Sequence, residues 1–271
     1  MLPLTDLTHL HWEGIEAGKP TTTGSFLKAV ADLPCGRVFY KLSLADIVLN
    51  KIIGYESFFE VIASRLCREL GIECVNYELI RAKILLPNNS ECIETHLCAS
   101  RDFRGNFKKE TAEGLCLLLG KDGETALETL RRLGFSDFID RLLLTDFLIC
   151  NRDRHGKNLE FYTKNGATKP VPLFDNGFSF VAPYGNNLEI IEKFNPLRDM
   201  PVNNFLGSKS LEENLRLIQK NVVVNKPKNG FRTELFRDME DLPSVVGNKA
   251  WEIFESRYFY AKDRKILVEG Q

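Results

Sequence analysis

A length of 271 residues is long for one hydrophobic core and short for two independent domains, so we expect two lobes with a cleft between them. The 36 Lys and Arg residues balance the 37 Asp and Glu residues without long runs of one sign, so no direct contact with nucleic acid is expected. Seven cysteines, an odd number without a Cys-x-x-Cys pair, indicate reduced core residues rather than disulfides or a zinc site. The sequence has no signal pattern and no apolar stretch near the ~20 residues of a membrane span, which predicts a cytoplasmic protein without a membrane span.

The first 98 residues predict a sheet that carries one helix. A flexible, hydroxyl-rich stretch at residues 21–25 comes before the first strand. Apolar residues at helical spacing predict a helix over residues 56–70, and Gly71 supplies its stop. The last two strands flank a Pro-Asn-Asn-Ser turn and predict an antiparallel hairpin. The strands are expected at residues 37–43, 74–86 and 91–98.

The rest of the chain predicts a mostly helical region. Helices are expected at residues 125–133, 136–148, 211–220 and 249–260. The second of these is expected to be capped by Ser136 and, because its apolar face is wide, to be buried. It leads into the irregular segment 151–158. Two short strands, residues 159–162 and 171–174, are then expected to pair around a turn at Gly166.

Three oxygen-bearing side chains follow the buried helix. Asp153 and Asn158 are five positions apart, and Asp175 comes at the end of the second short strand. Phosphoryl transfer needs one carboxylate to orient the attacking hydroxyl and accept its proton, and an amide oxygen and a second carboxylate to hold Mg²⁺ against the phosphates. A single Asp or Asn is more often a turn residue, because its side chain bonds the nearby backbone. The three in this order predict an ATP-dependent enzyme, with Asp153 catalytic and with Asn158 and Asp175 as metal ligands.

A lysine on the phosphates, held by a carboxylate, completes such a site. Lys41 is on the first strand, on the face opposite its apolar neighbours, and Glu60 on the following helix is its potential partner. The alternative is an exposed lysine and a surface glutamate that never meet, which is commoner for either residue alone. His155 is expected to brace the backbone through a hydrogen bond, while Lys157 either touches a phosphate or is a solvated charge.

The run Asn151-x-Asp153-x-His155-x-Lys157-Asn158 resembles the catalytic loop of the HipA-like serine/threonine kinases. This resemblance implies an α+β, two-lobed, protein-kinase-like fold. An antiparallel sheet with one helix then forms the nucleotide-binding N-lobe, residues 1–98, and a mostly helical C-lobe, residues 99–271, holds the catalytic loop and the metal site. The chain is too short for the additional N-terminal domain of HipA itself, so it looks more like the compact members of the family.

The same resemblance implies which residues meet the nucleotide. The run Thr21-x-x-Gly24-x-x-x-Lys28 is similar to the family's phosphate loop, and residues 93–99 correspond to the hinge strand beside adenine. The catalytic set implied is Asp153, Asn158, Lys41 and Glu60. The nucleotide-binding residues implied are Thr21, Gly24, Ser25, Lys28, Lys41, Thr95, Leu97, Cys98, His155 and Lys157. The resemblance also leaves self-phosphorylation at Thr21 open.

These observations predict a kinase that uses ATP and Mg²⁺ to phosphorylate serine or threonine of a protein substrate. A lipid or small-molecule alcohol is the alternative acceptor, because Asp175-Asn176-Gly177-Phe178 also resembles the metal segment of type II phosphatidylinositol 4-kinases, which share the fold. A third alternative is a module that binds nucleotide or a partner without turnover. The intact set of residues argues against that alternative, since a degenerate site usually loses one of them.

Overall fold

The structure, a computed structural model, describes residues 2–14, 26–34, 36–103, 108–164 and 167–270. Its largest sheet has five strands in the order β1-β6-β7-β3-β2, all antiparallel except that β1 pairs parallel with β6. The strands are β1 (Leu4–Asp6), β2 (Lys28–Leu33), β3 (Gly36–Leu42), β6 (Glu78–Leu85) and β7 (Cys92–Arg101). The first predicted strand and the predicted hairpin are confirmed as β3 and β6-β7, whereas the sequence pattern does not predict β1 or β2.

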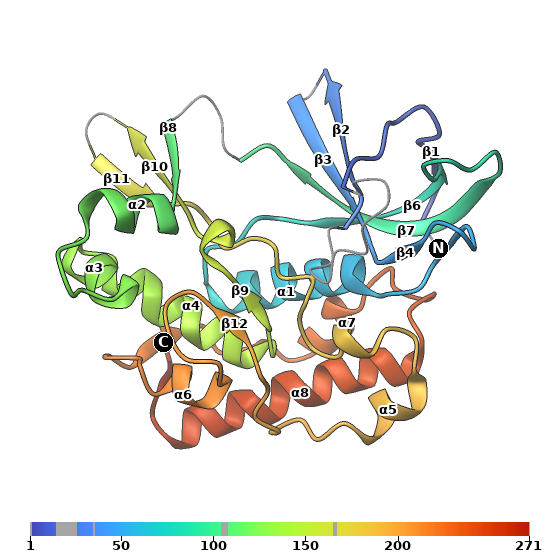
Figure 1. The fold of residues 1–271 in the computed structure, drawn as a ribbon. Helices are drawn as coiled ribbons and strands as arrows, with labels where there is room; N and C mark the ends of the chain where they lie inside the picture. Colours follow the sequence, from blue (N-terminus) through green and yellow to red (C-terminus); the bar gives the residue numbers. More distant parts are fainter. Residues whose placement is uncertain (1, 15–25, 35, 104–107, 165–166, 271) are drawn as a thin grey trace.

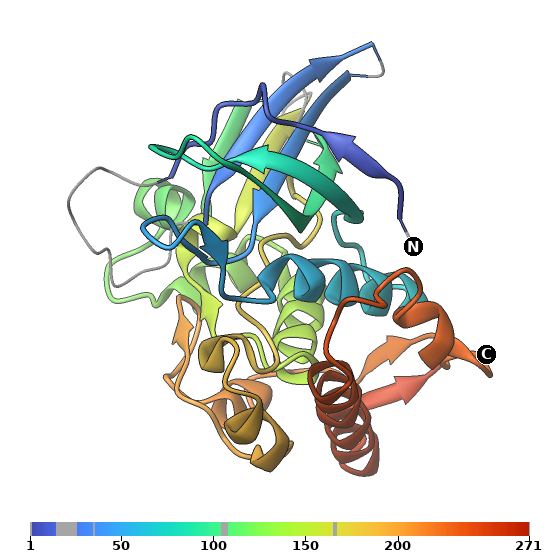
Figure 2. The ribbon, with the colours of Figure 1, turned by 90° about the vertical axis from the view of Figure 1, so that its right-hand side faces the viewer.

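Helix α1 (Glu56–Leu70) lies between this sheet and the helical half of the molecule, as Figures 1 and 2 show from two sides. Phe59 and Leu66 on the helix belong to the same buried core as Leu79 on the sheet. The helix ends at Gly71, whose φ of 69° is left-handed and whose N–H bonds to a carbonyl of the last turn. The predicted helix and its stop are therefore confirmed.

The sheet has a second core on its other face. Leu42 and Leu97 are completely buried there, under Leu7 and Trp12 of the N-terminal segment. Side chains alternate between the two faces of a strand, so the burial of Leu42 turns its neighbour Lys41 to the face on which α1 packs. The N-terminal segment thus covers one face of the sheet, and Lys41 lies on the other.

The second half of the chain is mostly helical, and all of its helices except α2, which lies beside the small sheet, are in the lower part of Figure 1. The helices are α2 (Ala112–Leu119), α3 (Ala126–Arg132), α4 (Ser136–Leu148), α5 (Leu188–Lys193), α6 (Leu211–Leu215), α7 (Phe231–Leu235) and α8 (Ser244–Asp263). A smaller sheet joins β8 (Lys108–Thr111), β10 (Glu160–Lys164) and β11 (Ala167–Pro170). Short pairs are β4 (Ala45–Asp46) with β5 (Lys51–Ile52), β9 (Asp153–Arg154) with β12 (Asn203–Asn204), and β13 (Val222–Val224) with β14 (Leu267–Glu269). This mixture of sheets and helices confirms the predicted α+β class, and none of the described helices is both long and apolar enough to cross a bilayer.

Two details of the helical half correct the predictions. Ser136 is the first residue of α4 rather than its cap, because Phe135 occupies the N-cap position and no side chain caps the helix. The helix expected at residues 211–220 ends at Leu215. The chain beyond it leaves the helix, because the backbone N–H groups of Gln219 and Lys220 donate to the carboxylate of Asp140.

The strand expected at residues 171–174 is also wrong. Strand β10 pairs with residues 167–170, which form β11, so the second strand begins four residues earlier than predicted, while the predicted turn at Gly166 lies outside the described residues. Leu173 instead forms a parallel bridge to Cys74, just after α1. The segment before Asp175 is therefore held at Val171 by a bond to the carbonyl of Glu160 on β10, and at Leu173 by the chain just after α1.

Candidate active site

Asp153 lies on a short strand that begins just after buried helix α4. This strand, β9, pairs in parallel with β12, and its partner residue is Asn203. The side-chain amide of Asn203 donates to Oδ1 of Asp153 at 3.1 Å. The side chain of Asp153 remains 38% exposed, so it is both oriented by the amide and open to an incoming hydroxyl.

Asp175 lies on a segment bonded to the Asp153 strand at two points. The backbone N–H of Arg152 donates to the carbonyl of Phe178 at 3.1 Å, and Nη1 of Arg154 donates to the carbonyl of Phe174 at 2.8 Å. Asp153 lies between the two donors, and Asp175 lies between the two acceptors. The two carboxylates predicted from the sequence therefore come from neighbouring segments. Asp175 has a left-handed backbone with φ of 58°, which is uncommon outside glycine.

Asn158 is bonded directly to the strand of Asp153. It is almost fully buried at the end of a single 3₁₀ turn, Gly156–Asn158. Its Nδ2 donates to the backbone carbonyl of Asp153 at 3.1 Å. Because the nitrogen of the amide is used in this way, the amide oxygen is the atom left to act as a ligand.

Lys41 forms a buried ion cluster with two carboxylates. Its Nζ lies 2.5 Å from Oε1 of Glu60 and also pairs with Oδ1 of Asp175, while the ring of Phe26 lies 4.7 Å from the same nitrogen. Burial opposes the charge on Lys41, but Asp175 and Glu60 outweigh it and raise the pKa of the lysine. Burial likewise works against ionised Asp175, but Lys41 and then Lys28 lower the pKa of that carboxyl. The structure thus brings together the lysine and glutamate that the sequence left as possibly separate.

The other oxygen of Glu60 links this cluster to the chain beyond Asp175. Oε2 of Glu60 accepts the backbone N–H of Asn176 at 2.8 Å. Glu60 is completely buried, so both of its oxygens are used where water cannot replace the partners. One side chain on α1 therefore positions both Lys41 and the segment that carries Asp175.

Arg154 is a central residue of the site that the sequence analysis missed. It is 1% exposed, and its guanidinium donates to both oxygens of Asp146, at distances from 2.8 to 3.2 Å. It also donates to Oδ1 of Asn176 at 2.5 Å. The signal available in the sequence was Asp146 itself, a carboxylate on the apolar face of a helix predicted to be buried, since such a charge needs a partner.

Of the residues implied at the nucleotide, Lys28 and Cys98 lie near Lys41. Lys28 is the strand partner of Lys41 on β2, close enough to Asp175 to lower its pKa. Cys98 is the partner on β7, and its Sγ lies 3.7 Å from the carbonyl of Lys41. Burial, followed by the charge of Glu60, raises the pKa of the Cys98 thiol, which keeps it protonated.

Other residues implied at the nucleotide lie elsewhere or outside the described part. Leu97 points into the opposite core, and Thr95 lines a separate cavity beside the start of α1, so the structure does not bring these two side chains to Lys41. Lys157 is exposed on the loop after Asp153. Thr21, Gly24 and Ser25 lie outside the described residues.

The structure does not give His155 the bracing hydrogen bond that was expected. Its Nε2 lies 3.8 Å from Oδ2 of Asp153, and its buried Nδ1 has no partner among the residues that the structure describes. The ring therefore lies beside the carboxylate of Asp153, and neither ring nitrogen is bonded to the backbone of the described residues.

The ion cluster predicts how pH acts on stability. A carboxyl with a lowered pKa, such as Asp175, stabilises the fold fully above its ordinary pKa of 3.8 and loses that contribution as pH falls toward its lowered value. Lys41, with a raised pKa, contributes fully below its ordinary 10.5 and loses its contribution only as pH rises through the raised value. Urea unfolding is measured at about pH 7, 5 and 3. Asp175→Asn is expected to lower the free energy of unfolding by the same amount at the two higher pH values and by less at the lowest. A cost that has already vanished at about pH 5 contradicts the pairing.

The arrangement is that of a kinase-like fold, in which a sheet with one helix meets a helical half at the ion cluster. No family model and no curated protein matches the sequence. The proinflammatory kinase CtkA of Helicobacter pylori has a similar structure, with a TM-score of 0.63 and 13% identity, over 97% of this chain and 99% of CtkA. HipA of Shewanella oneidensis MR-1, solved with HipB and operator DNA, matches with a TM-score of 0.48 and 15% identity over 93% of this chain and 68% of HipA. The similarity to CtkA confirms the kinase-like fold that the catalytic-loop resemblance implied.

Proposed function

We propose that this protein is a kinase that transfers the γ-phosphoryl group of ATP, with Mg²⁺, to serine or threonine of a protein substrate. The observation that carries the proposal is that Lys41, Glu60 and Asp175 form one ion cluster. The segment that carries Asp175 is in turn bonded to the strand of Asp153. Glu60 would hold the lysine while a phosphate replaces Asp175 as its second partner. The nucleotide would lie between an N-lobe of residues 1–98 and a C-lobe of residues 99–271. The protein would act in the cytoplasm, where ATP is available.

The residues of the Asp153 strand would handle the acceptor. In this proposal Asp153 accepts the hydrogen bond of the acceptor hydroxyl and takes its proton as the oxygen attacks phosphorus. The amide of Asn203 keeps the carboxylate turned toward that hydroxyl. Asn158 and Asp175 would hold Mg²⁺, which supplies charge neutralisation on the phosphates when bound. Among the described residues no group of three or more His, Cys, Asp and Glu forms a metal site, so nucleotide oxygens and water would complete the shell.

A transfer assay tests the proposal. The purified protein is incubated with γ-labelled ATP, Mg²⁺ and either a mixture of proteins or phosphoinositide vesicles, beside samples that contain a chelator. We expect label on serine or threonine of protein, and no label when the metal is removed. Label on lipid alone would keep the kinase but replace the acceptor. Binding of ATP with no transfer to any acceptor, the protein itself included, contradicts the proposed activity.

A further inference from the structure

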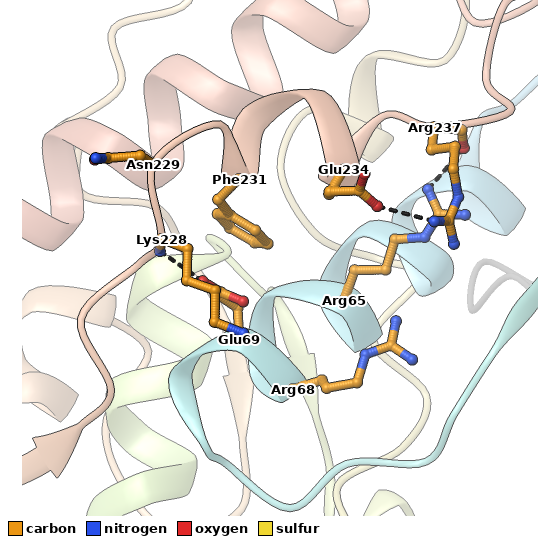
Figure 3. Close-up of a pocket in the computed structure, with 8 residues that line it drawn as sticks. All are labelled: Arg65, Arg68, Glu69, Lys228, Asn229, Phe231, Glu234 and Arg237. Carbon is orange, nitrogen blue, oxygen red and sulfur yellow. Dashed lines mark hydrogen bonds and ion pairs between the residues drawn. The ribbon is translucent and has the colours of Figure 1, made fainter.

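A charged hollow of about 300 Å³ lies between the last turns of α1 and the segment around α7, away from the ion cluster (Figure 3). Four basic side chains and two acidic ones line it. They are Arg65, Arg68, Lys228 and Arg237, with Glu69 and Glu234. The whole chain carries a net charge of −1, so this local excess of cations is not a general property of the surface.

Both acidic side chains of the hollow are engaged. Oε1 of Glu69 accepts the backbone N–H of Lys228 at 2.6 Å, and Oε2 of Glu234 accepts from Nη1 of Arg237 at 2.8 Å. The ammonium group of Lys228 has no partner within the described part of the chain, and Arg68 uses only one nitrogen there, toward Asn76 at 3.2 Å. Two exposed cations, Arg68 and Lys228, therefore form no ion pair within the described part of the chain, although Glu69 keeps its charge because its partner is a backbone N–H.

Arg65 forms a fixed wall of the hollow. Its Nη1 donates to the carbonyls of Leu235 and Arg237 at 2.8 and 2.7 Å, which ties α1 to the end of α7. Burial lowers the pKa of Arg65, and the charge of Arg237 lowers it further. Cations that crowd in this way repel one another, and a bound anion relieves that repulsion.

The site is larger than a single bound ion requires. A second hollow shares Arg68, Glu69 and Lys228 with the first and adds Lys226. The ring of Phe231, a core residue that is 7% exposed, also lines the hollow, and Figure 3 shows it between Lys228 and Glu234. A single anionic group with uncharged chain on either side fits this arrangement, whereas the carboxylates of the walls disfavour a polymer with a charge on every unit.

We propose that this hollow binds the phosphate group of a phosphorylated serine or threonine in a polypeptide, between Arg68 and Lys228. Arginine and lysine bind phosphate through charge-assisted hydrogen bonds, and Arg65 gives the site one immobile wall. The choice of a phosphorylated polypeptide rests on the proposed function, since such a chain is the product of that reaction. Arg65 and Arg68 lie on α1, the helix that carries Glu60, the ion-pair partner of Lys41. A bound phosphate would therefore also restrict the movement of this helix.

Fluorescence anisotropy without nucleotide tests the site independently of catalysis. A labelled neutral peptide with one phosphoserine is compared with the same peptide carrying serine or glutamate. We expect the phosphorylated peptide to bind tighter than the serine peptide by about tenfold or more, and salt to weaken it. The double variant Arg68→Glu with Lys228→Glu is expected to lose this preference. Equal binding of the serine and phosphoserine peptides overturns the proposal, whether or not the protein transfers phosphate.

A matched double variant, Lys121→Glu with Lys220→Glu, makes the same change in charge at exposed positions outside the hollow and is expected to keep the preference. Hydrogen exchange of the wild-type protein locates the site without any substitution. The phosphopeptide is expected to protect residues 65–70 and 226–237, and protection confined to other segments overturns the proposal. Inorganic phosphate is added as a competitor, and if it binds as tightly as the phosphopeptide, free phosphate replaces the polypeptide as the ligand.

Discussion

Asp153→Asn is expected to reduce the turnover number of phosphoryl transfer by about 10²- to 10⁴-fold, the usual contribution of a positioned general base. Asparagine has nearly the same shape and can still accept the hydrogen bond from Asn203, but it cannot take a proton. The side chain is partly exposed and makes no buried ion pair with a permanent cation in the described structure, so the fold is expected to survive. Steady-state kinetics give the rate, and a thermal melt checks the fold.

Asp122→Asn makes the same chemical change in an exposed turn remote from the site, and its turnover is expected to match the wild type. Asn203→Ala tests positioning. It leaves the carboxylate chemistry intact and removes one orienting bond, so its loss of rate is expected to be smaller than that of Asp153→Asn. Turnover of Asp153→Asn within a factor of about two of the wild type would mean that another group accepts the proton.

Arg154→Met is expected to lower the free energy of unfolding by about 3–5 kcal/mol, because it leaves the Asp146 carboxylate buried without a cation. It also removes the bonds from the guanidinium to the carbonyl of Phe174 and to Asn176, which position the segment of Asp175. Activity is therefore expected to fall even under conditions where the variant remains folded. Urea unfolding followed by circular dichroism measures the first effect.

The double variant Arg154→Met with Asp146→Leu separates the two roles. Removing both charges relieves the unpaired carboxylate, so much of the lost stability is expected to return while activity stays low. The surface pair Arg132 and Glu124 provides the control, because the corresponding change there, Arg132→Met, is screened by water and should cost much less. A loss of less than about 1 kcal/mol for Arg154→Met, equal to that of the surface variant, would contradict the role given to this buried pair.

The parts of the fold that the sequence predicts well are those with a strong local period or a strong local stop. Helix α1 has the predicted bounds because its apolar residues repeat at helical spacing and a left-handed glycine ends it. The hairpin β6-β7 follows from two strand-like runs around a turn rich in Pro and Asn. The strand order could not be predicted in the same way, because it depends on which strands meet in space and not on a local pattern.

Two of the errors in the secondary structure have a common cause, which is a partner that is distant in the sequence. The segment before Asp175 reads as a strand because its side chains are apolar, but beyond Val171 it leaves the hairpin, and Leu173 is bridged to Cys74 instead. The helix after Ser210 stops early because Asp140 binds the following backbone. Neither partner can be recognised from a local pattern.

For the candidate site, the sequence by itself was enough to predict Asp153, Asn158 and Asp175, because the spacing of residues along a loop is a local property of the chain. Only the tertiary structure decided that Lys41 meets Glu60 and Asp175, since that meeting depends on the outer core of the sheet turning Lys41 toward α1. The pairing of Arg154 with Asp146 was likewise decided only by the tertiary structure. A buried charge requires a partner, but the sequence does not say which one, because the choice depends on how separate elements pack.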